Sequence, residues 1–192
     1  MAVSINKSKK VTYADYLTWP DSERWEIIDG LPYNMSPAPS RRHQDILTAL
    51  AGHFVSFFKG KECKVYFAPF DVRLSDDYSQ EELVENVVQP DLSVFCDKNK
   101  LDEKGAIGAP DLVVEILSPS TSKKDMSEKL LLYQKFEVKE YWVIDPEGED
   151  VRVFVLDKNG RFYLLTILKK EETLKSKLFS GLTIPLEELF AE

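Results

Sequence analysis

The order of apolar and polar positions predicts helices and strands that alternate along the chain. Apolar residues recur at helical spacing over His43–Phe58, and Gly60 is expected to end this helix. Further helices are predicted over Ser127–Phe136 and, stopped by Pro20, over Tyr13–Asp21. Runs with the composition of strands are Cys63–Leu74, Asp91–Phe95, Asp111–Leu117 and Tyr141–Ile144.

Turn residues connect several of these segments. Asp29-Gly30 lies between the apolar halves of Trp25–Met35 and predicts a hairpin, and Asp157–Gly160 predicts another. The second hairpin joins Val151–Leu156 to Arg161–Leu168, and Leu182–Phe190 reads as a closing strand and short helix. The helix between Asp111–Leu117 and Tyr141–Ile144 predicts a right-handed βαβ crossover. The expected fold class is therefore α/β (α+β), with a mixed central sheet flanked by helices.

Composition bounds the class of protein. A chain of 192 residues with 43% hydrophobic residues predicts a single domain over residues 12–192, preceded by a flexible tail over residues 1–11. The chain contains no apolar run long enough to cross a membrane, and its polar, basic start lacks the core of a signal peptide. Two cysteines, Cys63 and Cys96, do not make a disulfide framework or a four-ligand zinc site. A soluble protein in the reducing cytoplasm, with no membrane partner, is expected.

The charge balance and the missing motifs exclude several functions. The formal net charge of −8 argues against a broad grip on nucleic acid, which needs clustered Lys and Arg. Part of the acidic excess, Asp76–Glu85, reads as a solvated loop. The sequence contains no glycine-rich phosphate loop, no GxSxG elbow and no HExxH helix. The remaining candidate chemistry is a set of carboxylates.

Glu115 is an acidic residue within the otherwise apolar run Leu112–Leu117. A charge inside a buried strand costs several kcal/mol unless it is paired or bound to a metal. An edge strand or an ion pair would explain it. However, Asp91 begins another apolar run, so neighbouring strands can bring two carboxylates together, and such oxygen ligands suit Mg²⁺ or Mn²⁺. Taken alone, Asp91 is equally typical of a turn after proline.

Lys129 is the candidate cation for such a site. It follows Asp125 by four residues and precedes Tyr133 by four, so the three lie on one helical face. The helix directly follows the Glu115 strand and must pack back on the same sheet. Lys129 can therefore reach the carboxylates and help deprotonate an attacking water, although a lysine on a helix is more commonly solvated.

Several motifs resemble one large bacterial family. They are QPDLSV at 89–94, GAPDLVVEILSPST at 108–121, VKEYWVIDP at 138–146, and the residues Asp125, Lys129 and Tyr133. Together they resemble the restriction endonuclease family of the PD-(D/E)XK nuclease superfamily, over about Tyr13 to Leu168. The resemblance implies a mixed sheet flanked by helices, with the active site at one end of a central hairpin.

The resemblance also implies roles for individual residues. Asp91 and Glu115 match the acidic motif residues and would hold Mg²⁺, and Glu26 would be the glutamate of the first motif. The lysine expected two residues after Glu115 is replaced by Leu117. The resemblance implies that a helix residue substitutes for it, and Lys129, beside Tyr133, is the candidate.

Other polar residues have two possible roles. His43, at the start of its helix, can orient a substrate phosphate or serve as a cap or core contact. Asp111 lies about 13 Å from Glu115 along the strand and is either a supporting ligand or a cap. The basic residues that flank the motifs and can contact phosphate are Arg41, Arg42, Lys123 and Lys124.

The leading hypothesis is a Mg²⁺-dependent endonuclease that hydrolyses DNA phosphodiester bonds. The alternative is a catalytically degenerate nuclease fold that serves as a DNA-binding or protein-assembly module. A third hypothesis, a hydrolase of a small phosphorylated substrate, predicts a closed pocket. We expect weak, local contacts with DNA, and a homodimer would suit the cutting of two antiparallel strands.

Overall fold

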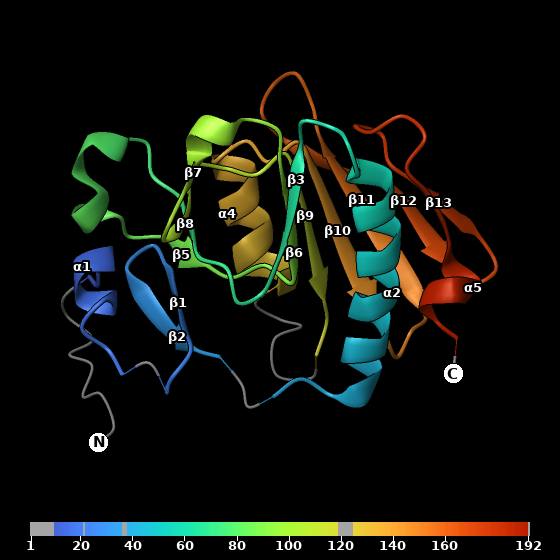
Figure 1. Ribbon diagram of the computed structural model, residues 1–192, viewed down its shortest axis with the longest axis horizontal. Helices are drawn as coiled ribbons and strands as arrows, with labels where there is room; N and C mark the ends of the chain where they lie inside the picture. Colours follow the sequence, from blue (N-terminus) through green and yellow to red (C-terminus); the bar gives the residue numbers. More distant parts are fainter. Residues whose placement is uncertain (1–9, 21, 36–37, 119–124, 192) are drawn as a thin grey trace.

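A six-stranded mixed sheet forms the centre of the computed structural model, which describes residues 10–20, 22–35, 38–118 and 125–191. Its strand order is β12-β11-β10-β9-β6-β3 (Figure 1). Strands β9 and β10 are parallel, and the other neighbours are antiparallel. The strands are β3 (Lys64–Phe67), β6 (Leu92–Phe95), β9 (Leu112–Ile116), β10 (Glu140–Asp145), β11 (Asp150–Leu156) and β12 (Phe162–Lys169).

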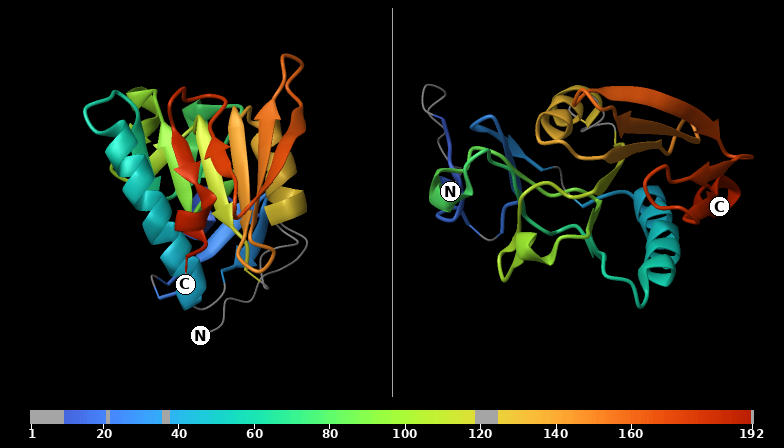
Figure 2. Two further views of the ribbon diagram at one scale, coloured as in Figure 1. Left: turned by 90° about the vertical axis from the view of Figure 1, so that its right-hand side faces the viewer. Right: turned by 90° about the horizontal axis from the view of Figure 1, so that it is seen from above.

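Both faces of this sheet are covered, which explains why β9 and β10 are almost continuously apolar. Helices α2 (Arg41–Phe58) and α5 (Leu186–Leu189) pack on one face. The other face packs against α4 (Leu130–Lys135) and against a second sheet, as the two views of Figure 2 show. A π-helical turn, Asp125–Lys129, leads into α4.

The second sheet consists of short strands in the order β2-β1-β5-β4-β8-β7. They are β1 (Trp25–Ile28), β2 (Leu31–Asn34), β4 (Val72–Arg73), β5 (Val87–Val88), β7 (Leu101–Asp102) and β8 (Gly105–Ile107). The remaining elements are α1 (Tyr13–Tyr16), the 3₁₀ helices η1 (Tyr78–Leu83) and η2 (Lys98–Lys100), and the hairpin of β13 (Thr173–Lys175) with β14 (Thr183–Pro185). Because β1 belongs to this sheet, it can bring a side chain toward the central sheet from outside.

The predicted fold class is confirmed: the fold is α+β, with a mixed central sheet flanked by helices. The hairpin at Asp29-Gly30 forms between β1 and β2, and Asp29 and Gly30 both have positive φ, as that turn requires. The hairpin of β11 and β12 and the β9–α4–β10 crossover also form. The closing strand and helix appear as β14 and α5.

Two predictions about the middle of the chain are wrong. The segment Cys63–Leu74 is not one strand: it turns at Ala68-Pro69, and its halves, β3 and β4, enter different sheets. Pro69 has no N–H to continue a sheet ladder. Asp76–Glu85 is not wholly solvated, because it contains η1, Val84 is buried, and Glu81 forms an ion pair with the buried Arg73.

The expected flexible tail falls largely outside the described residues, which begin at Lys10. The backbone N–H of Val11 donates to the carbonyl of Gly30, at 2.9 Å. Lys10 forms an ion pair with Glu85, so residues 10 and 11 contact the second sheet. Within the described ranges, no helix has both the length and the apolar character to cross a membrane.

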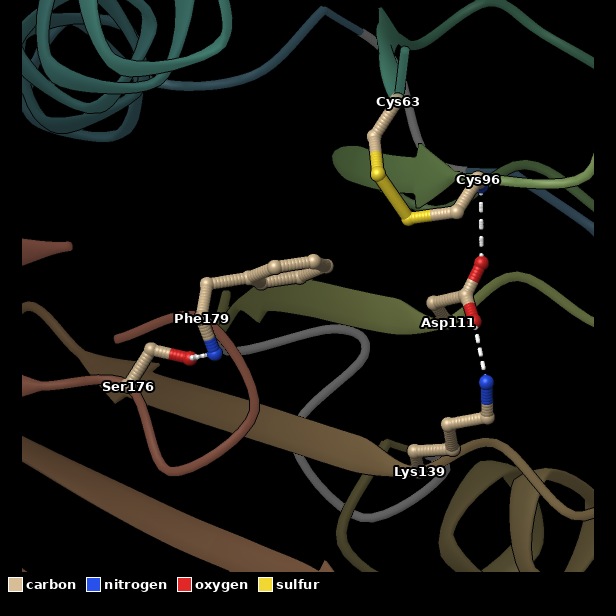
Figure 3. Close-up of a disulfide and its surroundings, with 6 residues drawn as sticks. All are labelled: Cys63, Cys96, Asp111, Lys139, Ser176 and Phe179. Atoms are coloured by element: carbon tan, nitrogen blue, oxygen red, sulfur yellow. Dashed lines mark hydrogen bonds and ion pairs between the residues drawn. A yellow bond between two sulfur atoms is a disulfide. The ribbon is translucent and has the colours of Figure 1, made fainter. Parts of the chain in front are cut away.

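A disulfide links Cys63 to Cys96, across 33 positions of sequence (Figure 3). Because Lys64 of β3 pairs with Phe95 of β6, the cysteines lie opposite each other at the next position of the register. This pairing was not predicted from the sequence. Beside it, the Cys96 N–H donates to Asp111 Oδ2 at 2.8 Å, and Lys139 Nζ lies 2.6 Å from Asp111 Oδ1. Asp111 therefore anchors the start of β9, at the opposite end of the strand from Glu115.

Candidate active site

Glu115 lies on β9 with its side chain turned toward α4. Its carboxylate oxygen Oε1 is 2.7 Å from Lys129 Nζ, and the Tyr133 hydroxyl donates to the same oxygen at 2.7 Å. Glu115 is 3% exposed and Lys129 is 2% exposed. The cost of removing such a charged pair from water is offset only when the pair's geometry is good and further hydrogen bonds are made.

Glu26 approaches the same lysine from the second sheet. Lys129 Nζ lies 2.8 Å from Glu26 Oε1, and the backbone N–H of Gln89 donates to that oxygen at 3.0 Å. Glu26 is fully buried on β1. Lys129 therefore joins two carboxylates that come from different sheets and lie 89 residues apart in sequence (115 − 26 = 89).

The helical spacing predicted for Lys129 and Tyr133 brings both side chains to Glu115. The side chain of Asp125, the third residue of that face, lies outside the described part of the structure. Burial raises the pKa of Tyr133 well above its usual value, and the negative charge of Glu115 raises it further. Tyr133 is therefore a hydrogen-bond donor to the carboxylate and not a base at neutral pH.

Asp91 lies directly before β6, at the same end of the sheet. Leu92 pairs with Val114, so one further step of the register places Asp91 opposite Glu115. Asp91 Oδ2 accepts the backbone N–H of Ile116 at 2.8 Å. The carboxylate is thus held to β9 beside Glu115.

His43 contacts Asp91 from α2. The imidazole Nε2 is 3.2 Å from Asp91 Oδ2, and Ser40 caps the helix by accepting the His43 backbone N–H at 3.2 Å. His43 is 7% exposed, and its Nδ1 is buried with no hydrogen-bond partner. His43 therefore adjoins a carboxylate and is not simply a core contact.

The six predicted site residues thus fall into two contacting groups. Lys129 contacts Glu26 and Glu115, which Tyr133 also contacts, while His43 contacts Asp91. The strand register brings the two groups together at one end of the antiparallel β6–β9 pair.

The basic residues considered for phosphate contacts have other partners or no described position. Arg42 donates to the carbonyls of Phe190 and Ala191 and pairs with Glu149, so it fastens α2 to the end of the chain. Arg41 pairs with Asp45 on its own helix. Lys123 and Lys124 lie outside the described residues.

Gln89 and Arg24 adjoin this site but were not found from the sequence. The Gln89 side-chain oxygen accepts from Arg24 Nε at 3.1 Å and Nη2 at 2.7 Å. The Gln89 amide nitrogen donates to Asp71 Oδ1 at 2.8 Å, and Tyr16 donates to the same oxygen at 3.1 Å. Burial raises the pKa of Asp71. The position of Gln89, two residues before Asp91, was the available signal.

The carboxylates fit a hard divalent cation with few protein ligands. Among the described residues, no group of three or more His, Cys, Asp or Glu side chains is arranged to enclose a metal. Asp91 and Glu115 nevertheless offer oxygen donors from opposed strand positions. Mg²⁺ is commonly bound through one or two carboxylates, with waters and substrate phosphate completing its shell, so this donor set suits it.

Comparison with known proteins identifies the family to which the chain belongs. Residues 13–187 match the Uma2 family, described as "Putative restriction endonuclease". The chain belongs to the Uma2 family. An uncharacterized protein of Synechocystis sp., slr1290, is 26% identical to this Uma2 chain over 159 residues, which cover 81% of this chain and 80% of that protein.

One solved structure has a fold similar to that of this Uma2 chain. The crystal structure of a "putative nuclease belonging to DUF820" from Anabaena variabilis ATCC 29413 superposes with a TM-score of 0.72 at 21% identity. The match covers 94% of this chain and 98% of that one. The predicted restriction-endonuclease-like family is confirmed by the family match, and the solved structure has the same fold as this chain.

Proposed function

We propose that this Uma2 protein is a Mg²⁺- or Mn²⁺-dependent endonuclease that hydrolyses DNA phosphodiester bonds. The observation that carries the proposal is the buried Lys129, within 2.8 Å of both Glu26 and Glu115. A lysine beside acidic residues is the combination that metal-assisted phosphodiester hydrolysis needs. The family membership and the fold neighbour support the same class of activity.

Asp91 and Glu115 are the residues that would hold the metal. Both present carboxylate oxygens at one end of the β6–β9 pair, and Asp91 is oriented by the Ile116 N–H. Mg²⁺ held there would act as a Lewis acid toward the phosphoryl oxygen and would lower the pKa of a water bound to it. Glu26 orients Lys129 from the second sheet, so the carboxylates have distinct roles.

Lys129 takes the place of the motif lysine that Leu117 has replaced. Its ammonium, oriented by Glu26 and Glu115, donates a hydrogen bond to the attacking water or to the oxygen that gains charge. Tyr133 fixes the shared carboxylate of Glu115 by donating to Oε1. Lys129 therefore arrives from a helix and not from the motif strand.

His43 is the proposed contact for the substrate phosphate near Asp91. Its Nε2 faces Asp91 Oδ2 at 3.2 Å, and a rotation of the ring would turn this nitrogen, as a hydrogen-bond donor, toward an incoming phosphate. The net charge of −8 makes contacts with DNA weak and local. A homodimer would present two such sites to the antiparallel strands of a duplex.

Plasmid cleavage tests this function. Supercoiled plasmid is incubated with the protein in Mg²⁺ or Mn²⁺, and nicked and linear products are followed over time. Glu115→Gln keeps the shape of the side chain but removes its charge, and is expected to lower the rate by at least roughly 100-fold. Asp111→Asn is the matched control on the same strand, because Asp111 lies at the opposite end and anchors Cys96; it should retain the rate.

The outcomes separate the candidate functions. Equal cleavage by the native chain and Glu115→Gln would assign the activity to a contaminant and overturn the proposal. DNA binding without cleavage in either metal would favour the alternative, a degenerate nuclease fold that serves as a DNA-binding module. Loss of cleavage in Glu115→Gln, with cleavage retained in Asp111→Asn, supports the endonuclease. A separate light-scattering measurement of the mass reports the oligomeric state.

A further inference from the structure

Arg24 presents a guanidinium next to the proposed active site. It lies directly before β1, and strand alternation puts its side chain on the same face as Glu26, two residues later. Gln89 connects the two residues: its backbone N–H donates to Glu26 Oε1, and its side-chain oxygen accepts from Arg24 Nε and Nη2. The guanidinium is therefore fixed relative to the Glu26 carboxylate through one buried residue.

Arg24 forms no salt bridge within the described part of the chain, although its charge acts on the carboxyl of Asp71 from a distance. Its guanidinium donates to the neutral amide oxygen of Gln89. The nearby carboxyl of Asp71 accepts hydrogen bonds from Tyr16 and Gln89 instead. In contrast, four arginines of the described chain pair with acidic side chains: Arg41, Arg42, Arg73 and Arg152.

This arrangement leaves part of the guanidinium available to a ligand. Arg24 is exposed, whereas Gln89 is 6% exposed. Gln89 occupies Nε and one hydrogen of Nη2, so Nη1 and the outer hydrogen of Nη2 remain as donors. Parallel N–H donors on a planar cation match the oxygens of a phosphate group.

We propose that Arg24 binds a backbone phosphate of the nucleic-acid substrate next to the bond that is cut, with Gln89 as its positioning residue. This inference rests on the proposed endonuclease function and adds a substrate contact to it. The ligand is a phosphodiester of the DNA backbone, and the contact does not distinguish one base sequence from another. Such a contact gives a chain of net charge −8 a local attraction for DNA beside its carboxylates.

Binding of a fluorescein-labelled duplex, measured by anisotropy over a series of salt concentrations, tests the proposal. Arg24→Gln is expected to weaken binding roughly tenfold and to reduce the slope of log K against log salt by about 0.9, the value for one lost contact. Arg24→Lys keeps the charge but loses the planar fork and should restore part of the affinity.

Arg161→Gln is the matched control. Arg161 is exposed, forms no salt bridge within the described residues, and lies beside the β11–β12 turn. That turn is at the Glu140 end of β10, whereas Glu115 lies beside Val143 near the other end. The control removes the same charge far from the site and should leave both affinity and slope nearly unchanged. Circular dichroism and thermal melts check that each variant is folded.

The outcomes distinguish this inference from the proposed function. Equal binding by Arg24→Gln and Arg161→Gln, or no binding of DNA by the native chain, overturns the phosphate contact. A native chain that cleaves plasmid while Arg24→Gln leaves KM unchanged refutes the contact and leaves the nuclease intact. A higher KM with a retained kcat supports it. Binding that depends on Arg24 without any cleavage supports the contact and removes the endonuclease.

Discussion

Removing the Cys63–Cys96 disulfide should lower the free energy of unfolding by about 3.7 kcal/mol at 25 °C. The magnitude follows from the chain that the bond closes, which spans 33 positions between the two cysteines. In the chain-entropy relation, a loop of this length gives an entropy difference of about 12.5 cal/mol/K in the unfolded state. The bond stabilises the fold because the unfolded chain that contains it has fewer conformations.

Urea unfolding, followed by the fluorescence of the three tryptophans, measures the effect. The samples are the oxidised native chain, the native chain in reductant, and the Cys63→Ser/Cys96→Ser variant. The reduced chain and the variant should unfold together, at least about 1 M urea below the oxidised chain. A thiol assay reports the redox state of each sample. An unchanged midpoint in a sample with both thiols free would refute the reasoning.

Variants at three further positions test the polar interior. Glu140→Ala removes the buried carboxylate that accepts hydrogen bonds from Trp142 Nε1 and from two backbone N–H groups. It should lower the free energy of unfolding in urea by at least about 3 kcal/mol, and Glu140→Gln should lower it less. Tyr133→Phe removes the hydroxyl that donates to Glu115 and should cost roughly 1.5–3 kcal/mol in the same assay. Burial raises the pKa of Asp71 in the folded state, so the folded chain binds this proton more tightly than the unfolded chain does. The native chain therefore loses stability as pH rises from the unfolded pKa of Asp71 through its folded pKa. Asp71→Asn removes that loss, and its stability relative to the native chain, measured from about pH 4 to 7, should increase with pH.

Local pattern was sufficient for much of the fold. The βαβ unit could be predicted because β9 and β10 are buried on both faces and therefore read as continuous apolar runs. The Asp29-Gly30 hairpin could be predicted because its backbone conformation demands those residue types. Lys129 and Tyr133 could be placed on one helical face by their spacing, and that face meets Glu115.

Features that depend on contacts between distant segments could not be predicted from local pattern. The second sheet is assembled from strands of two to four residues, too short for a periodic signal. The disulfide follows from the β3–β6 register, which spacing alone does not give. Gln89 bridges Arg24 and Glu26 only after β1 and the chain before β6 have come together. The one sign in the sequence was the position of Gln89, two residues before Asp91.

We propose that Lys129, from a helix, takes the catalytic place of the lysine that the motif strand lacks. The rate of single-turnover cleavage of a DNA duplex by Lys129→Gln tests it most directly. Lys135→Gln is the matched control, because Lys135 is a half-exposed lysine of α4 that pairs with Asp29. We expect a rate at least roughly 100-fold lower for Lys129→Gln, with native DNA affinity, and a native rate for Lys135→Gln. Equal rates for the two variants would contradict it.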